Sequence, residues 1–194
     1  MLTTETVVID DAIAELGDRI DDLADDRETR NPASDEYAAI KDREDRLSYL
    51  RDGLRWQRDE EGWGGDATVT LGALTAGEEA IMHRAMSANP NRNERRLWFV
   101  AAATVDAPYG ASRDPDEEPL TESTIEETFA ALAGQGIHSG FVKWAESKAN
   151  ALATPGGPGN GDRSAESSQA TTASATSTTG PDSTTTSSSD SRTD

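Results

Sequence analysis

The stretch VVIDDAIAELGDRIDDLADDRE, Val7 to Glu28, carries the clearest structural pattern in the chain. Its large apolar residues alternate spacings of four and three, which places them on one face of a helix. They are Ile9, Ile13, Leu16, Ile20 and Leu23. Aspartate and glutamate dominate the other faces. The spacing predicts an amphipathic helix that must bury its apolar face against a second element.

A second helix is expected directly after the segment TRNPAS, in which Pro32 interrupts the first pattern and Ser34 is suited to cap the new helix. Its apolar face would comprise Tyr37, Ile40, Leu47, Leu50 and Leu54. Asp42 and Arg46 are spaced to pair on its solvated face. A connection of about six residues suits antiparallel helices. Residues 1–61 are therefore predicted to form an antiparallel helical hairpin.

The segment EEGWGGD places three glycines around Trp63 and is expected to end the second helix. A short alternating strand is predicted over residues 67–71. Thr75 and Glu78 then stand in capping-box spacing at the start of a third helix. Residues 62–153 are predicted to form a small, mostly helical domain with this short strand near its N-terminus.

Three further segments complete that domain. Asn93 is expected to cap an apolar helix that continues through Thr104 and Val105. The proline-containing, acidic stretch from residue 106 to 120 is predicted to be a surface loop. Ser123 and Glu126 form a second capping-box pair, and Gly134 is expected to end the helix that they begin. A last helix is predicted from the apolar residues Ile137, Phe141, Trp144, Ala145 and Leu152.

From residue 154 onward the composition changes, and 20 of the 41 remaining residues are serine or threonine. Such a segment lacks the apolar surface needed to offset the entropy of folding. It is either a solvated tether or modification platform, or a tail without a selected role. The predicted fold class is thus mainly α, with a helical hairpin, a small helical domain and a disordered Ser/Thr-rich tail over 154–194.

The charge of the chain bears on its partners and its source. With 37 acidic and 18 basic residues the formal net charge is −19, so a nucleic acid would meet electrostatic repulsion. Fifteen of the basic residues are arginine and three are lysine, a bias similar to that of extremely halophilic archaeal proteins. Plain solubility or an acidic interaction face would also explain it. No apolar run approaches the roughly 20 residues of a membrane span, so a soluble, intracellular protein without membrane partners is expected.

No catalytic, cofactor-binding or metal-binding site is predicted. The chain has no cysteine, which removes disulfides and thiolate ligands. His83 and His138 stand outside any metal-ligand motif, and Ile137 occupies the first glycine position of a G-x-S-x-G elbow. The acidic loop from Asp114 to Pro119 lacks the glycine and distal glutamate of an EF-hand. An enzyme is the class least favoured, and an interaction surface is favoured instead.

Residues 67 to 145 resemble the tail assembly chaperones of tailed viruses, which are small, mostly helical proteins that begin with a short strand. The similar features are TVTL leading into LTAGEE, the apolar helix RRLWFVAAATV with its acidic, proline-bearing loop, and the final GIHSGFVKW. Together with the halophilic bias, the resemblance implies a virus or provirus of a haloarchaeon. The N-terminal hairpin is an addition to the family pattern.

The resemblance implies that the chain binds the tape measure protein and delivers it for tail-tube polymerisation. The expected location is the high-salt host cytoplasm, with absence from the mature virion. The apolar residues Ile81, Met82, Met86 and Phe141 are the expected contacts, because methionine adapts to varied helical clients. Trp63 either anchors the two segments or docks a partner. The alternatives are a head-tail connector of the virion, or an adaptor in which the hairpin mediates homo-oligomerisation.

Overall fold

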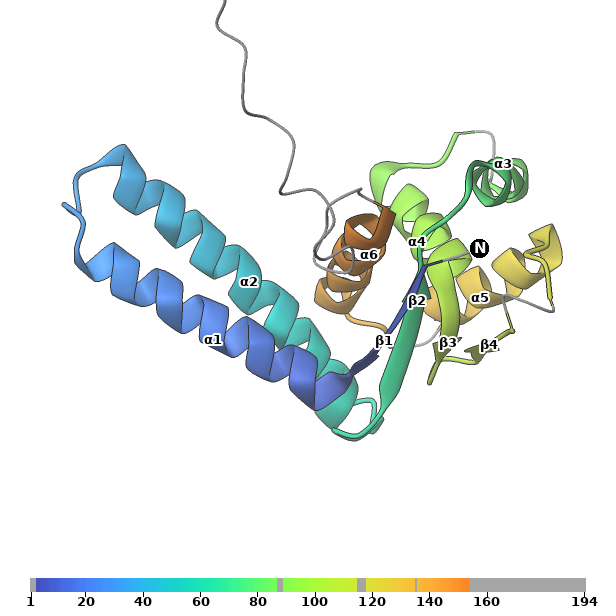
Figure 1. The fold of residues 1–194 in the computed structure, drawn as a ribbon, viewed down its shortest axis with the longest axis horizontal. Helices are drawn as coiled ribbons and strands as arrows, with labels where there is room; N and C mark the ends of the chain where they lie inside the picture. The colour runs from blue at the N-terminus through green and yellow to red at the C-terminus, as the bar shows by residue number, and fades with distance from the viewer. Residues whose placement is uncertain (1–2, 87–88, 115–117, 135, 154–194) are drawn as a thin grey trace, which may run out of the picture. The chain divides into compact units, whose positions relative to one another are not determined.

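The computed structural model describes residues 3–86, 89–114, 118–134 and 136–153, which belong to one compact unit (Figure 1). The elements in chain order are β1 (Thr4–Val8), α1 (Ile9–Glu28), α2 (Asp35–Asp59), β2 (Thr68–Gly72), α3 (Ala76–Ala85), α4 (Arg92–Ala103), β3 (Thr104–Ala107), β4 (Ala111–Ser112), α5 (Glu122–Gly134) and α6 (Ser139–Ala153). Helices predominate, so the predicted mainly α fold class is confirmed. The predicted disorder of the tail concerns residues outside the described ranges.

The helices α1 and α2 form the predicted antiparallel hairpin (Figure 1). Their buried apolar residues follow the predicted faces and are Ile9, Ala12, Ile13, Leu16 and Ile20 from α1, with Ile40, Leu50 and Leu54 from α2. Leu23 and Leu47 belong to the same faces but remain partly exposed. The apolar pattern therefore fixes the helix pairing without burying every member of it.

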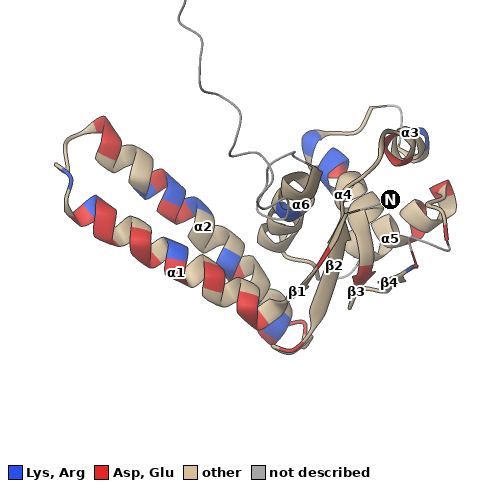
Figure 2. Cartoon of the chain, in the orientation of Figure 1, with Lys and Arg blue, Asp and Glu red and all other residues tan. Residues whose placement is uncertain are grey.

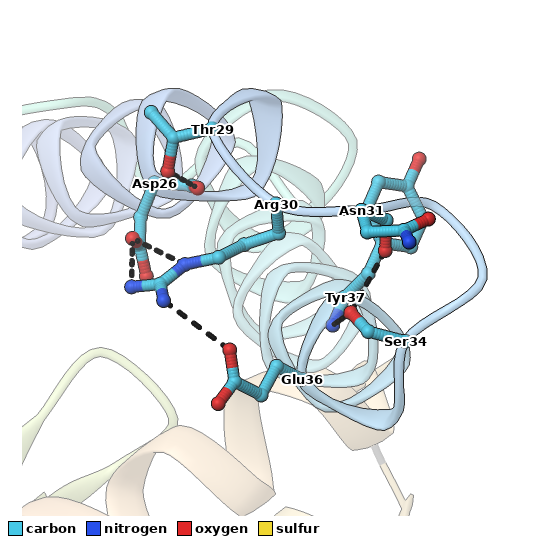
Figure 3. Close-up of polar contacts among 7 residues, drawn as sticks. All are labelled: Asp26, Thr29, Arg30, Asn31, Ser34, Glu36 and Tyr37. Atoms are coloured by element: carbon cyan, nitrogen blue, oxygen red, sulfur yellow. Dashed lines mark hydrogen bonds and ion pairs between the residues drawn. The ribbon is translucent and has the colours of Figure 1, made fainter.

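Charged and polar side chains organise the turn between α1 and α2 (Figure 3). The Arg30 guanidinium donates to the carboxylate of Asp26 at 2.8 Å and to that of Glu36 at 3.2 Å. The Ser34 hydroxyl accepts a hydrogen bond from the backbone nitrogen of Tyr37 at 3.2 Å, which confirms Ser34 as the cap of α2. The expected pair between Asp42 and Arg46 does not form, and Lys41 pairs with Asp45 at 3.6 Å on this helix instead.

The four strands form one antiparallel sheet in the order β1, β2, β3, β4. The sequence pattern predicts β2 alone and misses β1 (Thr4–Val8), whose residues lie inside the predicted helical hairpin of residues 1–61. Val7 pairs with Val69, and the hydroxyls of Thr6 and Thr70 lie 2.9 Å apart. Helix α1 follows β1 without a side-chain cap, because the backbone nitrogen of Ile9 donates to the carbonyl of Ala67 at 2.9 Å. Because the start of α1 needs no capping side chain, the sequence contains no signal for the boundary between β1 and α1.

Strands β3 and β4 replace two features expected from the sequence. Helix α4 ends at Ala103, so Thr104 and Val105 belong to β3 rather than to the helix. The predicted surface loop from residue 106 contains the rest of β3, a turn with Gly110 at φ +99° and β4. Tyr109 in that turn is 1% exposed, and its hydroxyl lies 2.5 Å from the hydroxyl of Thr104. A buried aromatic ring thus stabilises this segment from within.

Two helix starts differ from the prediction by two residues, and others agree. Asn91, not Asn93, caps α4, and its side chain accepts from the backbone nitrogens of Asn93 and Glu94. At α5 the Thr121 hydroxyl accepts from the backbone nitrogen of Thr124, whereas Ser123 lies inside the helix. The Thr75–Glu78 capping box at α3 and the end of α5 at Gly134 are both as predicted.

Two glycines allow α2 and α6 to approach at backbone distance. A Cβ atom added to Gly53 would lie 2.5 Å from the carbonyl carbon of Gly140 and closer still to the nitrogen of Phe141. Beside this contact the buried side chain of Gln57 accepts a hydrogen bond from the nitrogen of His138 at 2.8 Å. Residues on both sides of the predicted division at residue 61 therefore share one sheet and one apolar core.

Candidate functional site

An open cleft of about 1680 Å³ lies between the hairpin and the body of the chain, which we define as β1–β4 with α3–α6. Its walls are one face each of α1, α2 and α6, the first turns of α4, and residues 3–5 at the start of β1. We refer to it as the cleft. In Figure 1, α1 and α2 lie beside each other, and α6 and α4 lie to their right.

Helical periodicity explains why these side chains share the cleft. On α2 the lining includes Arg43, Arg46, Leu47 and Leu50, at the three- and four-residue spacings of one face. The same spacing on α1 selects Glu15, Leu16, Arg19, Asp22 and Leu23, and on α6 it selects Lys143, Trp144, Ser147, Lys148, Ala151 and Leu152. Each helix therefore presents a mixed apolar and charged stripe to the cleft.

The charge of the cleft differs in sign from that of the chain. Seven of the 18 basic residues line it, whereas only four of the 37 acidic residues do so. Figure 2 shows mostly acidic residues along α1, residues of both signs along α2, and basic residues at the start of α4. The cleft thus has three more basic than acidic side chains in a chain with a net charge of −19.

Most acidic residues of the cleft have a basic neighbour there. The pairs are Arg19 with Glu15 at 3.7 Å, Lys148 with Glu15 at 3.1 Å and with Glu5 at 3.7 Å, and Arg96 with Glu146 at 2.5 Å. Three exposed arginines, Arg43, Arg46 and Arg92, make no ion pair or side-chain hydrogen bond within the described residues. Lys143 lies over the Tyr49 ring, with its Nζ 4.4 Å from the ring centroid. The basic side chains therefore exceed their internal partners.

Apolar side chains form the remainder of the lining. Leu16, Leu50 and Trp144 are buried residues of the main core that border the cleft. Leu23, Leu47 and Leu152 are partly exposed beside them. A cleft lined by both leucines and cations is suited to bind an amphipathic segment, because such a segment carries an apolar face and charged flanks.

The residues predicted to bind a partner lie away from the cleft. Phe141 is fully buried, and Met82 is 7% exposed, so neither side chain offers a surface to a partner in this conformation. Trp63 is partly buried and packs edge-on against Phe141, with ring centroids 5.2 Å apart. Ile81 and Met86 are partly buried on or beside α3 and pack against the core. The structure thus groups Trp63 with Phe141, and Ile81 with Met82 and Met86, in two separate places.

The two histidines show no arrangement typical of catalysis. The Nδ1 atom of His138 accepts a hydrogen bond from the backbone nitrogen of Gly140 at 3.0 Å, which places it at the start of α6. His83 is exposed on α3. Among the described residues, no group of three or more histidine, aspartate and glutamate side chains is placed to hold a metal ion. Within the same residues, no helix has the length and apolar character required to cross a membrane.

Sequence reasoning missed the cleft because four helices and a strand contribute to it. One signal was present: Arg43 and Arg46 adjoin Leu47 and Leu50 on the apolar side of α2. The prediction of a solvated pair with Asp42 assigned Arg46 to the opposite side of the helix. Comparisons of the chain with protein-family models, with curated proteins and with solved structures found no match.

Proposed function

We propose that this chain is a non-catalytic binding protein whose cleft receives a helical segment of another protein. The size of the cleft is the observation that carries the proposal. Small-molecule sites occupy about 300–1,000 Å³. A helix about 11 Å wide that rises 1.5 Å per residue fills about 140 Å³ per residue. The cleft of about 1680 Å³ therefore has the volume of about three turns of helix.

Within this class, we propose the role of a tail assembly chaperone that holds the tape measure protein before tail-tube polymerisation. The resemblance of residues 67–145 supports this role, and the cleft supplies a place for an apolar helix of the client. The N-terminal hairpin, which is an addition to the family pattern, forms one side of that place. The proposed setting is the high-salt host cytoplasm, with the protein absent from the mature virion.

Co-expression with the tape measure protein encoded in the same genome tests this role. We expect the client to stay soluble and to co-purify with the chain in molar potassium chloride. If the wild-type chain never retains the client, the chaperone role is wrong. Stoichiometric presence of the chain in purified particles would then favour the head-tail connector.

Two matched variants locate the contact. Leu23→Asp places a charge in the cleft at a partly exposed position outside the main apolar core, so the fold is expected to survive. Met86→Asp places the same charge on the surface predicted from the sequence. We expect Leu23→Asp to release the client and Met86→Asp to retain it, provided that circular dichroism shows both variants folded. The reverse pattern would return the binding site to α3.

A further inference from the structure

The sign of the charge in the cleft identifies the chemistry of the segment that it accepts. The chain as a whole has about twice as many acidic as basic residues, and a cleft of average composition would share that ratio. Seven basic and four acidic residues line it instead. Since helix positions, not composition, select these side chains, the fold concentrates positive charge at the cleft.

Three arginines are available to a ligand. Arg43 and Arg46 lie one turn apart on α2, and Arg92 begins α4 on another wall. All three are exposed, and none is paired within the described part of the chain. A guanidinium binds a carboxylate through two parallel hydrogen bonds, which makes arginine the preferred partner of aspartate and glutamate at interfaces.

We infer that the cleft selects an amphipathic helix of another protein, in which a leucine-type apolar face is flanked by aspartate or glutamate. Leu23, Leu47 and Leu152 receive the apolar face. Arg43, Arg46 and Arg92 receive the carboxylates. This inference rests on the proposed function, because it takes the cleft as the binding site and adds the charge of the segment.

A polyanion such as a nucleic acid fits the cleft less well. Any strand longer than the cleft would run over a surface that carries the remaining 33 acidic and 11 basic residues. A helix of about three turns stays inside it. At molar salt the screening length falls to about 3 Å, so only charges in direct contact attract. Arginine–carboxylate pairs in direct contact, next to leucines that the bound helix covers, keep their attraction at molar salt. Long-range attraction to a phosphate backbone is lost.

Fluorescence anisotropy with synthetic probes tests the inference on the full chain. The first probe is a labelled helical peptide of about three turns, the length matched to the cleft, with leucines at three- and four-residue spacing and glutamates beside them. The second probe replaces every glutamate with lysine. The third is a single-stranded oligothymidylate of similar charge to the first. Titrations are carried out in molar and in tenfold lower potassium chloride, wherever circular dichroism shows the chain folded.

The double variant Arg43→Glu with Arg46→Glu reverses the charge at two exposed cleft positions. Arg55→Glu is the matched control, because Arg55 is an exposed arginine on the same helix outside the cleft. We expect the acidic peptide to bind the wild-type chain and the Arg55 variant equally. The double variant should bind it roughly tenfold or more weakly, and it should gain affinity for the lysine peptide.

Three results would overturn the inference. Equal binding of both peptides would show that apolar contact alone selects the ligand. Equal or tighter binding of the oligothymidylate would assign the cleft to polyanions. No binding of the acidic peptide would exclude the site. These outcomes are separable from the chaperone test, since the acidic peptide can bind the cleft whether or not the tape measure protein is the natural client.

Discussion

The turn end of the hairpin, residues 21–49, and the body of the chain are stabilised by different means. Across the fully described stretch from 21 to 49, Ile40 is the one buried residue. In the body Val69, Leu71, Ile125 and Phe141 are each exposed by 1% or less. The body therefore relies on burial of apolar surface, which contributes about 25 cal/mol per Å².

Ion pairs take a larger share at the turn end. Arg27 pairs with Glu44 across the two helices at 3.0 Å and lies over the Tyr37 ring at 5.7 Å. Exposed pairs contribute about 0–1 kcal/mol each. The comparison shows that an amphipathic pattern is enough to pair two neighbouring helices. The sheet of the body, in contrast, depends on apolar side chains from segments far apart in the sequence that are buried together. The comparison also predicts that the molecule is most sensitive where the base of the hairpin packs against the body.

The largest effect is expected from Gly53→Ala at the contact of α2 with α6. The added Cβ would lie 2.5 Å from the carbonyl carbon of Gly140, and backbone cannot move aside as a flexible side chain can. We expect the free energy of unfolding to fall by about 2–4 kcal/mol. Urea unfolding in molar potassium chloride, followed by tryptophan fluorescence and circular dichroism, measures it.

Gly17→Ala on α1 is the matched control. No atom would lie within 4 Å of a Cβ at Gly17, so the substitution removes the flexibility of a helical glycine without a clash. It should raise the free energy of unfolding by about 0.5–1 kcal/mol. A similar change from both glycines would contradict the close approach of α2 and α6.

An intermediate effect is expected at alkaline pH, and it concerns the body. Burial raises the pKa of Tyr109 above its ordinary value of 10.0, although the hydrogen bond with Thr104 acts in the opposite direction. Above pH 10 the unfolded chain loses this proton and the folded chain keeps it, so unfolding becomes easier as pH rises. The free energy of unfolding should fall by about 1.4 kcal/mol per pH unit from this group.

Tyr109→Phe isolates that contribution from other groups that titrate in the same range. The variant keeps the buried ring and removes the ionisable hydroxyl. Its stability, measured by urea unfolding between pH 9 and pH 11, should decline less steeply than that of the wild-type chain. Parallel curves for the two proteins would show that Tyr109 gains access to water in the folded state.

The smallest effects are expected at the helix caps, where the two regions can be compared directly. Ser34→Ala removes one hydrogen bond at the start of α2, and Thr75→Ala removes one side of the capping box of α3. Each should cost about 1 kcal/mol. Because Glu78 also lies 3.6 Å from the buried Arg113, Thr75→Ala should cost more. Hydrogen exchange of the first-turn amides measures both, and a larger effect of Ser34→Ala would reverse the comparison.

The elements that sequence reasoning identified are those whose signals are local. The stripe of α1 and the caps Ser34 and Thr75 depend on neighbours within a few residues, and all three were predicted. Strand β1 was not, because its pairing with β2 depends on residues far along the chain. Thr104 and Val105 continue the apolar pattern of α4, so the sequence gives no signal that the helix ends and β3 begins there. The caps Asn91 and Thr121 were missed because a second capping residue follows each within two positions.

The candidate site shows the same limit, because local sequence signals identify helix faces but not the contacts that form between distant segments. The sequence predicts Ile81, Met82, Met86 and Phe141 as contacts because they are apolar residues on helices, but their burial depends on what packs against those helices. Amphipathic spacing identifies a face but does not say which partner covers it. The cleft depends on the placement of α6 beside the hairpin, which the Gly53–Gly140 contact sets. Neither glycine carries a recognisable pattern in the sequence.

The pairing of Val8 with Thr68 has a consequence for the order in which the chain folds during synthesis. At roughly 5–20 residues per second, a ribosome needs about 3–12 seconds to add the residues between β1 and β2. The hairpin forms from local contacts, and helices and short loops close within microseconds. It can therefore be complete before β2 emerges. A formed hairpin shortens the flexible connection from about 60 to about 10 residues and lowers the entropic cost of closing it by about 1.6 kcal/mol. In this order of events the hairpin brings β1 back to the point where β2 leaves the ribosome.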